Sequence, residues 1–235
     1  MHRFFVAPEM LRADRVTLTG AQARQIATVL RLRPGDEIAL VADGAEAVVA
    51  LEAVRPASVT AVVRERGFTP AEPTVALTLA LPVLRGDHDE EVVEAVTQLG
   101  VSRIVPFTSA RSVARSLSDA KRSRWERIAR EAAETARRGR IPSIDPAIAW
   151  SELFNILPAP VLVAWESERR MRLRDALPSS VRALSLVIGP EGGIADEEIA
   201  LAREHGAVIV TLGGRNLRSE TAAIAAVALA MDRLS

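Results

Sequence analysis

Two stretches of the chain each join a short apolar strand to a glycine-bearing turn and a helix start. The first runs over Leu186–Ile194 and includes Gly189–Gly193; the second runs over Leu212–Ala222 and includes Gly213 and Gly214. Glycine turns let a small molecule lie against bare backbone, because no Cβ blocks the approach. Ligands of open α/β sheets usually bind at the strand ends. Two such turns in one domain therefore predict a single ligand held from two sides.

The two turns do not match the common phosphate-binding patterns. Neither has a Gly-Lys-Ser/Thr after a four-residue spacer, which excludes a P-loop, and neither contains G-x-G-x-x-G, which leaves a Rossmann dinucleotide site unsupported. On spacing alone, Gly189–Gly193 is as consistent with a plain tight turn as with a ligand loop.

The composition is that of a globular protein with a sizeable core, at 49% hydrophobic and 26% charged residues in a chain of 235. The absence of cysteine excludes disulfides and thiolate metal sites and agrees with a reducing compartment. His2, His88 and His205 have no metal-ligand spacing, so we expect no metal. With no apolar run of about 20 residues and no signal-peptide pattern, we expect a cytoplasmic protein without a membrane partner.

Basic residues are concentrated in one stretch, although the formal net charge is zero. Ten basic and four acidic residues give the segment a local charge of +6. The basic residues are Arg111, Arg115, Lys121, Arg122, Arg124, Arg127, Arg130, Arg137, Arg138 and Arg140. Such asymmetry is typical of a surface that meets a phosphate backbone. A solvated helix face is the alternative.

Residues 1–68 are predicted to form a small β-barrel domain, which commonly serves as an RNA-binding platform. Alternating apolar and polar residues are separated by turn signals at Pro34-Gly35-Asp36 and Asp43-Gly44. One helix is expected over Ala21–Arg31, and Gly67–Pro73 is the expected linker. The expected strands are Arg3–Val6, Val16–Thr19, Glu37–Ala42, Glu46–Val54 and Ser58–Arg64.

From Thr74 onward strands alternate with helices, which predicts an α/β domain with a mostly parallel sheet covered on both faces. The expected strands are Val75–Leu81, Val101–Phe107, Val161–Trp165, Leu184–Ile188 and Ala207–Leu212. The expected helices are one ending at Gly100, a long one with Trp125, Ile128, Ala129, Ala132 and Ala136 at three-and-four spacing, and one over Asp196–His205. We expect this domain to span residues 73–235.

The last expected helix, Ser219–Leu234, is apolar on nearly every side through Ile224, Val227, Leu229 and Met231. A sheet covers only one side of such a helix, and a large exposed apolar patch is unusual for a monomer. Because burial against the same helix of a two-fold partner is the common solution, we predict a homodimer.

The motifs resemble the RsmE-like family of SPOUT (trefoil-knot) methyltransferases over nearly the whole chain. Gly189–Gly193 and Leu217–Ala222 match the two cofactor loops of that family and are the most specific part. The other matching segments are Arg3-Phe4-Phe5, Val29-Leu30-Arg31, Pro34-Gly35-Asp36, Asp43-Gly44, Leu77–Leu81, Thr97–Val101, Pro106–Thr108 and Glu131–Arg138 followed by Pro142. Arg85, Gln98 and Thr135 depart from the family pattern, in which lysine, glutamate and glutamine are usual.

The resemblance implies a PUA-like β-barrel over residues 1–68, then a SPOUT α/β trefoil-knot domain over residues 73–235, in a homodimer with its active site at the subunit interface. It also implies transfer of a methyl group from S-adenosylmethionine to N3 of a uridine in 16S ribosomal RNA, free or in the small ribosomal subunit. The implied cofactor-binding residues are Ile188, Gly189, Pro190, Glu191, Gly192, Gly193, Leu212, Gly213, Leu217, Arg218, Ser219, Thr221 and Ala222.

Methylation at N3 requires that the cofactor and the base be held in line and that the N3 proton be removed. Deprotonated uracil is an anion, which a neighbouring guanidinium stabilises, and we assign this role to Arg218. Glu191 and Glu220 are candidate general bases or substrate-orienting acceptors. Either can instead serve only to cap a helix or to complement its dipole.

A base inside structured RNA must be unstacked to be reached, so contacts to the surrounding phosphates are expected to hold it exposed. The candidate RNA-binding residues are Arg3, Arg31, Arg33, Arg85, Arg111, Arg138 and Arg140. Two other readings stay open. One is a SPOUT enzyme with another RNA target or with ribose 2′-hydroxyl specificity, and the other is a non-catalytic RNA-binding or ribosome-assembly factor.

Overall fold

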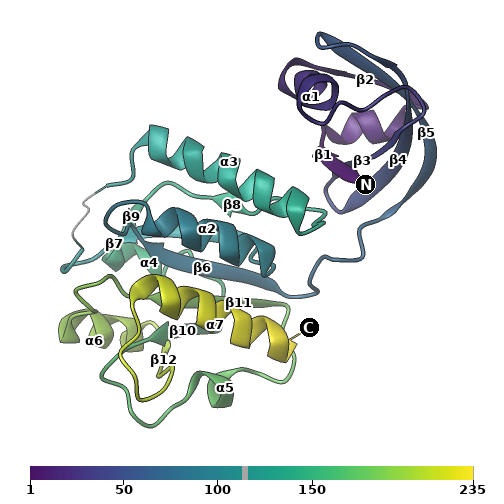
Figure 1. Cartoon of the computed structure of the whole chain (residues 1–235). Coiled ribbons are helices and arrows are strands. Elements are labelled where there is room, and N and C mark those ends of the chain that lie inside the picture. The colour runs from purple at the N-terminus through teal and green to yellow at the C-terminus, as the bar shows by residue number, and fades with distance from the viewer. Residues whose placement is uncertain (113–115, 235) are drawn as a thin grey trace. The chain divides into compact units, whose positions relative to one another are not determined.

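The computed structural model describes residues 1–112 and 116–234, and these form two compact units (Figure 1). Unit 1 comprises Met1–Glu72 together with Ala133–Arg140, and unit 2 comprises Pro73–Ala132 and Ile141–Ser235. The boundary between Glu72 and Pro73 lies within the predicted linker Gly67–Pro73. The grouping of residues 133–140 with the N-terminal unit was not indicated by any sequence pattern. Arg115 of the basic stretch lies outside the described residues.

Unit 1 is built on a five-stranded sheet with the order β1-β3-β4-β5-β2. The β1–β3 pair is parallel and the other pairs are antiparallel. The strands are β1 (His2–Phe5), β2 (Arg15–Thr19), β3 (Glu37–Ala42), β4 (Ala45–Val54) and β5 (Ser58–Phe68). The helical segments are the 3-10 turn η1 (Pro8–Arg12), α1 (Gly20–Arg24) and the π-helical turn η2 (Gln25–Val29).

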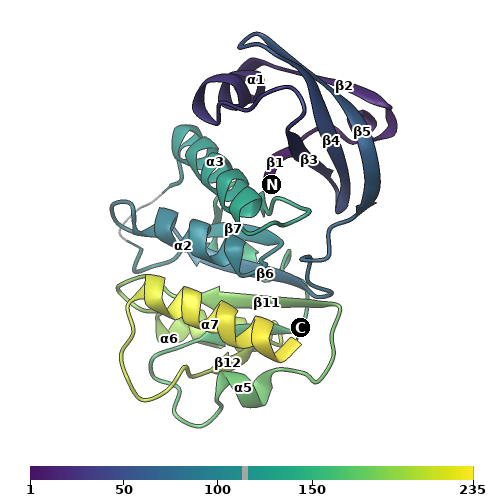
Figure 2. The same ribbon diagram turned by 45° about the vertical axis from the view of Figure 1, so that its right-hand side comes forward.

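The predicted small PUA-like β-barrel is not confirmed, since the five strands form an open sheet. Within the described residues, β1 pairs only with β3 and β2 only with β5, so both remain edge strands. Irregularities at Val48/Val49 and Leu51/Ala53 bend the long β4–β5 pair, and the curled strands are visible in Figure 2. Leu11 of η1 and Ile26 of η2 pack into the core of the sheet, so helical segments fill the concave side that barrel closure would otherwise cover.

The predicted turn between β3 and β4 is confirmed, whereas the predicted helix and linker of unit 1 differ in detail from the structure. Asp43 and Gly44 have φ of 49° and 85°, as a tight two-residue hairpin turn between β3 and β4 requires. The expected helix over 21–31 instead splits into α1 and η2, because the amide of Leu30 bonds to the carbonyl five residues earlier, at Gln25. Strand β5 continues to Phe68, so the predicted linker begins inside a strand.

Unit 2 contains a seven-stranded sheet with the order β12-β10-β11-β6-β7-β8, in which β9 also pairs with β7. All these pairs are parallel, which confirms the predicted α/β class. The strands are β6 (Ala76–Pro82), β7 (Arg103–Thr108), β8 (Ser143–Ile144), β9 (Ile148–Ala149), β10 (Val161–Ala164), β11 (Ala183–Ile188) and β12 (Val208–Val210). The helices are α2 (His88–Gln98), α3 (Asp119–Thr135), α4 (Trp150–Leu153), α5 (Leu173–Ala176), α6 (Asp196–Glu204) and α7 (Ser219–Leu234).

Two apolar cores lie on opposite faces of this sheet. Leu186 and Ile188 of β11 join the core shared with α2, α3, α5 and α7, whereas Val187 between them joins the core shared with α4 and α6. Figures 1 and 2 show α2 and α7 side by side over one face. Helices α4 and α5 and strands β8 and β9 were not predicted, because two to four residues carry no measurable periodicity.

Helix α7 is covered within the chain on more sides than the sequence suggested. It packs against α2, α5 and β11, and Val227 is fully buried. Val227 is one of the apolar residues from which the sequence predicted a partner subunit, and it belongs to the core of its own chain. Leu229 is 49% exposed, and Ile224 on the same helix is partly exposed. Among the described residues, no helix is both long and apolar enough to cross a membrane.

Candidate functional site

The strand order of unit 2 reverses beside β6. The chain continues from β6 to β7 and β8 on one side, and later fills the other side with β11, β10 and β12. Ligands of open parallel sheets bind at the carboxyl ends of strands beside such a reversal. A pocket of about 1020 Å³ opens there, lined by residues that follow β6, β10, β11 and β12. This volume accommodates a nucleoside-sized ligand with an extended side arm.

The segment after β11, residues 189–193, forms one wall and is called the first glycine loop. A Cβ on Gly189 would lie 2.7 Å from Ile194 Cγ1, and one on Gly192 would lie 2.9 Å from the carbonyl oxygen of Arg111. Gly193 has a φ of +72°, and a Cβ there would meet the carboxylate of Glu166. The free side of Gly192 thus faces Arg111. A side chain at Gly192 would press on backbone, and the left-handed φ of Gly193 favours glycine whatever the space. A side chain at Gly189 would require Ile194 to shift.

The segment after β12, residues 212–218, forms the opposite wall and is called the second glycine loop. Gly213 has a φ of +119°, which favours glycine, and its amide donates a hydrogen bond of 3.2 Å to Thr211 Oγ1. No atom lies within 4 Å of a Cβ built on Gly213 or Gly214. The second loop therefore borders open space, as a ligand-facing loop must.

A buried hydroxyl connects the two loops. Ser219 begins α7, is 6% exposed and donates a hydrogen bond of 2.8 Å to the carbonyl oxygen of Gly189. The first turn of α7 is closed by the amide of Ala222, which donates to the carbonyl of Arg218 at 2.8 Å. The start of α7 thereby fixes the end of the second loop against the first.

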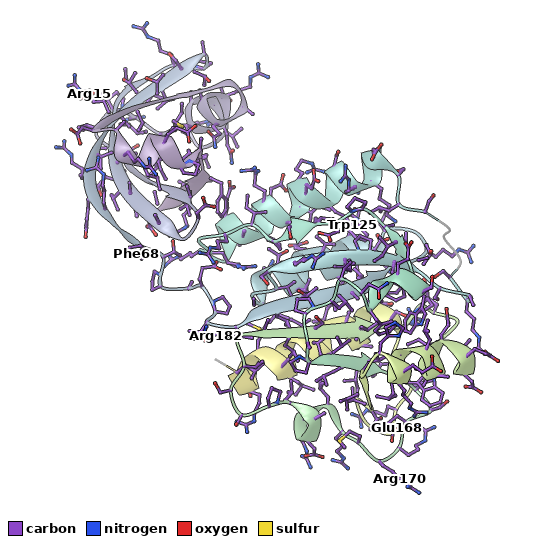
Figure 3. All side chains as sticks on the ribbon, turned by 180° about the vertical axis from the view of Figure 1, so that it is seen from behind. Arg15, Phe68, Trp125, Glu168, Arg170 and Arg182 are labelled. Carbon is purple, nitrogen blue, oxygen red and sulfur yellow. The ribbon has the colours of Figure 1, made fainter. Side chains whose placement is uncertain are left out.

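The segment after β10 forms a third wall. Trp165, Glu166, Ser167 and Arg169 line the pocket. Glu168 Oε1 accepts hydrogen bonds from the amides of residues 169, 170 and 171 at 2.9, 2.6 and 3.2 Å. These bonds, chiefly the one from residue 170, lower the pKa of Glu168, so its carboxylate stays ionised and holds the turn. Figure 3 labels Glu168 on this segment.

The segment after β6 completes the pocket with Arg85, Gly86 and His88. The amide of Arg85 donates a hydrogen bond of 2.9 Å to Oε1 of Glu191, which joins this segment to the first glycine loop. Side chains of both charges therefore surround the pocket. The acids are Glu166, Glu191 and Glu220, and the basic residues are Arg85, His88, Arg169, Arg215 and Arg218. This suits a ligand that itself carries charges of both signs.

Comparison with known proteins identifies the family. A model described as RNA methyltransferase domain matches residues 70–231. The chain is 30% identical over 242 residues to ribosomal RNA small subunit methyltransferase E of Bacillus subtilis, with 97% of this chain and 94% of that protein covered. The chain belongs to this methyltransferase family. A Mycobacterium bovis protein of the same name is 34% identical, with 88% of this chain and 82% of that protein covered.

A solved member of the methyltransferase E family has the same fold over nearly the whole chain. It is the Neisseria gonorrhoeae protein bound to S-adenosyl methionine, with a TM-score of 0.89 and 30% identity over 97% of this chain and 95% of that one. The family resemblance seen in the sequence is thereby confirmed.

The residues expected from this family to bind cofactor converge on the one pocket, with a single exception. Thr221 is exposed and does not line the pocket, although it follows Glu220, which does. The pocket-lining members of the predicted set are Ile188, Gly189, Pro190, Glu191, Gly192, Gly193, Leu212, Gly213, Leu217, Arg218, Ser219 and Ala222.

The three residues predicted to act on the substrate, Arg218, Glu191 and Glu220, also line this pocket. They differ in exposure and in their contacts. Arg218 has a side chain that is 82% exposed, and Nη1 lies 4.0 Å from Oε1 of Glu220, whose side chain is 16% exposed. Such a pair at a solvated surface is weak, so the guanidinium is free to turn toward a substrate. Glu191 is held by the amide of Arg85.

The predicted RNA-binding arginines divide into exposed and internally bound groups. Arg31, Arg33, Arg85, Arg111 and Arg140 are exposed. Arg138 is 2% exposed, and its Nε and Nη2 each lie 3.2 Å from an oxygen of Glu72. The side chain of Arg3 is 9% exposed and pairs with Glu46 at 2.7 Å. Both guanidinium groups are committed to unit 1, so the expectation that Arg3 and Arg138 bind phosphate is corrected.

Several pocket residues were not singled out in the sequence, among them Trp165, Glu166 and Arg169. They directly follow the carboxyl end of β10, which was itself predicted. The rule that ligands bind at strand ends could have found them, but only the strand order reveals that β10 lies beside β11 and β12. Among the residues that the structure describes, no group of three or more His, Asp or Glu side chains is placed to hold a metal.

Proposed function

We propose that this protein transfers the methyl group of S-adenosylmethionine to N3 of a uridine in 16S ribosomal RNA. We further propose that this uridine is uracil 1498, the target that the resemblance to the RsmE-like family implies. One observation carries the proposal. Two glycine loops, distant in sequence from the β6 and β10 segments, close around one pocket of mixed charge at the reversal of a parallel sheet. The relative from Neisseria gonorrhoeae, similar over nearly its full length, is bound to S-adenosyl methionine.

The pocket residues fit this cofactor. Ile188, Leu212 and Leu217 supply an apolar wall for a nucleoside base, and the space beside Gly213 and Gly214 admits it. Acidic and basic side chains around the pocket suit a ligand that carries a sulfonium, an ammonium and a carboxylate. When bound, the cofactor supplies an electrophilic methyl group on a positively charged sulfur.

The substrate side of the reaction is assigned to the start of α7. Glu220 would accept the N3 proton of the uracil on a carboxylate oxygen, which leaves an electron pair on N3 for the new bond to the methyl carbon. The bond from that carbon to the cofactor's sulfur would break in exchange, and its electron pair would leave with the sulfur as a neutral thioether. The exposed guanidinium of Arg218 is assigned to the uracil oxygens, where it would stabilise the negative charge that deprotonation creates. Glu191 instead holds the Arg85 segment and shapes the pocket, because its carboxylate accepts the Arg85 amide.

We assign RNA contact to the exposed arginines: Arg31, Arg33 and Arg140 in unit 1, and Arg85 and Arg111 in unit 2. Unit 1 serves as the PUA-like RNA-binding module of the family in this proposal. The trefoil knot implied by the resemblance to SPOUT enzymes is part of the same proposal.

A homodimer is part of the proposed active form. Leu229 exposes 49% of its surface on α7, among the partly exposed residues Ile224, Ala225 and Ala228. An apolar patch on a helix that begins at the active site is suited to a second subunit. We expect Leu229→Asp to be a monomer by light scattering at micromolar concentration, and to have reduced methyltransferase activity. A fully active monomeric wild type would contradict the dimer and leave the cofactor site intact.

The test of the reaction is mass spectrometry of nucleosides from 16S ribosomal RNA, from cells with and without the protein and after incubation of the purified protein with RNA or small subunits. We expect 3-methyluridine to depend on the protein and on S-adenosylmethionine. Appearance of 2′-O-methyluridine instead would establish ribose specificity. Cofactor binding with no modified nucleoside on either substrate would favour an assembly factor.

A matched pair of variants tests the RNA assignment. Arg140→Ala removes an exposed charge. The slope of log binding constant against log salt concentration is therefore expected to fall by about one, because one counterion fewer is released. Arg138→Ala leaves Glu72 without its guanidinium and is expected to destabilise unit 1 by roughly 3 kcal/mol. Its salt slope is expected to match the wild type. A reduced salt slope for Arg138→Ala would mean that Arg138 contacts RNA after all.

A further inference from the structure

Lys121, the only lysine of the chain, connects the start of α3 to the segment that enters α2. Its Nζ lies 2.7 Å from Oδ2 of Asp89 and donates a hydrogen bond of 3.0 Å to the carbonyl oxygen of Gly86. Three parts of the chain, the first turn of α3, the first turn of α2 and the loop before it, thus meet at one ammonium group.

The carboxylate that Lys121 meets is not a surface group. Asp89 is fully buried, whereas the side chain of Lys121 is 24% exposed. Burial raises the pKa of Asp89 despite the opposing effect of Lys121, so this carboxylate depends on its partner for compensation. A buried acid with one cationic partner fixes the position of both more strictly than an exposed ion pair does.

The segment that Lys121 holds is a wall of the pocket. Arg85, Gly86 and His88 line it, and Gly86 turns the chain with a φ of +68°. From Gly86 the contacts continue to the first glycine loop, because the amide of Arg85 donates to Glu191 Oε1 at 2.9 Å. A continuous path of polar contacts therefore runs from Lys121 through the loop before α2 to residues 189–193.

A second ion pair one turn further along α3 lacks these connections. Arg124 Nη2 lies 2.7 Å from Oε2 of Glu90, and the side chain of Arg124 is 52% exposed. Like the Lys121 pair, it joins α3 to the first turn of α2. Neither Arg124 nor Glu90 lines the pocket. The Arg124–Glu90 pair is therefore a control for the effect of joining α3 to α2 without a contact to the pocket segment.

We propose that Lys121 is a positioning residue for the cofactor pocket, which it serves by holding the Gly86 carbonyl and Asp89 so that Arg85 and Glu191 stay in register. The role rests on the proposed S-adenosylmethionine site. Lys121 itself does not line the pocket, so it acts through the loop rather than on the ligand. It is one of the basic residues that the sequence grouped with a phosphate-binding surface, but its ammonium group instead contacts Asp89 and the Gly86 carbonyl.

The experiment compares cofactor affinity and thermal stability in the full chain. Titration calorimetry with S-adenosylmethionine is run on the wild type, Lys121→Met and the control Arg124→Met. Loss of a charged hydrogen bond to the loop is expected to weaken affinity about tenfold in Lys121→Met. Arg124→Met leaves the buried carboxylate of Glu90 without this partner, so a loss of thermal stability is expected. Its affinity is expected to stay within about twofold of the wild type, because neither Arg124 nor Glu90 lines the pocket.

Two further variants separate positioning from folding. Lys121→Arg keeps a cationic donor and is expected to recover most of the affinity. In the double variant Lys121→Met with Asp89→Asn, no unpaired buried charge remains, so thermal stability returns while the Gly86 carbonyl stays unheld and affinity stays low. In turnover assays, KM for the cofactor is expected to rise about tenfold while kcat changes less than about twofold.

Three outcomes decide the matter. Equal affinities for Lys121→Met and Arg124→Met would overturn the positioning role, as would a double variant that regains affinity together with stability. A wild type that does not bind S-adenosylmethionine would overturn the proposed function itself, and the role with it. A wild type that binds, with affinity lost selectively at Lys121, supports both.

Discussion

In the first glycine loop, protein atoms fill the space beside Gly189, Gly192 and Gly193, whereas no atom lies within 4 Å of a Cβ built on Gly213 or Gly214 in the second. Both loops follow strands of the same sheet and line the same pocket. The first loop is a packed wall, in which protein atoms lie where the side chains of other residues would be. The second is an open wall whose glycines leave room for a ligand. The same residue type therefore serves stability on one side of the pocket and binding on the other.

The largest effect is expected from a side chain added to the packed wall. Gly193→Val places a branched residue at a φ of +72° and against the carboxylate of Glu166. We expect a loss of about 3 kcal/mol in the free energy of unfolding, measured by urea denaturation. Gly193→Ala is expected to be partly rescued by Glu166→Ala, which removes the obstructing group. Full wild-type stability of Gly193→Val would mean that the first loop is not a packed wall.

A side chain on the open wall is expected to act on binding alone. A Cβ built on Gly214 meets no atom within 4 Å, and the backbone there is not in the left-handed region, so Gly214→Val should change the unfolding free energy by less than about 0.5 kcal/mol. The isopropyl group would occupy ligand space, so affinity for S-adenosylmethionine should fall about tenfold, or about 1.4 kcal/mol. Unchanged affinity in calorimetry would remove Gly214 from the ligand surface.

The hydrogen bond between the loops is expected to matter to both properties. Ser219→Ala removes the 2.8 Å bond to the Gly189 carbonyl and leaves that oxygen without this donor. We expect a loss of about 1 kcal/mol in stability and a fewfold loss in cofactor affinity. Thermal unfolding with and without cofactor measures the two effects together. A loss of stability with intact affinity would show that the loops bind independently of each other.

The smallest expected effect is a pH dependence of the unfolding free energy that comes from Asp89, which is linked to the first glycine loop through Lys121 and the loop before α2. Burial raises the pKa of Asp89 above its ordinary 3.8, so the folded state holds this proton more tightly than the unfolded chain. The contribution of Asp89 to stability is complete below the ordinary value and is lost as pH rises through the raised pKa. Asp89→Asn removes the titration, so its stability relative to the wild type should increase with pH across that window. A relative stability that falls with rising pH would mean that Lys121 pairing outweighs burial.

The sequence alone determined the features that depend on neighbours along the chain. Strand and helix alternation after Thr74 predicted the parallel sheet, because the periods of buried positions differ between strands and helices. The Asp43-Gly44 turn followed from the backbone freedom of those two residues. Residues 189–193 and 217–222 carried the family resemblance, and all but Thr221 of their predicted cofactor residues line one pocket.

Tertiary structure decided what each charge and each glycine does. The sequence could not show that Arg138 is held by Glu72 while Arg140, two residues away, is exposed, because that depends on a partner 66 residues distant. It could not separate the packed Gly193 from the open Gly214, nor show that Val227 is covered within its own chain. For the same reason the sequence did not show that the sheet of unit 1 is open or that Lys121 pairs with Asp89. Burial and pairing are set by contacts between distant segments, and local periodicity does not report them.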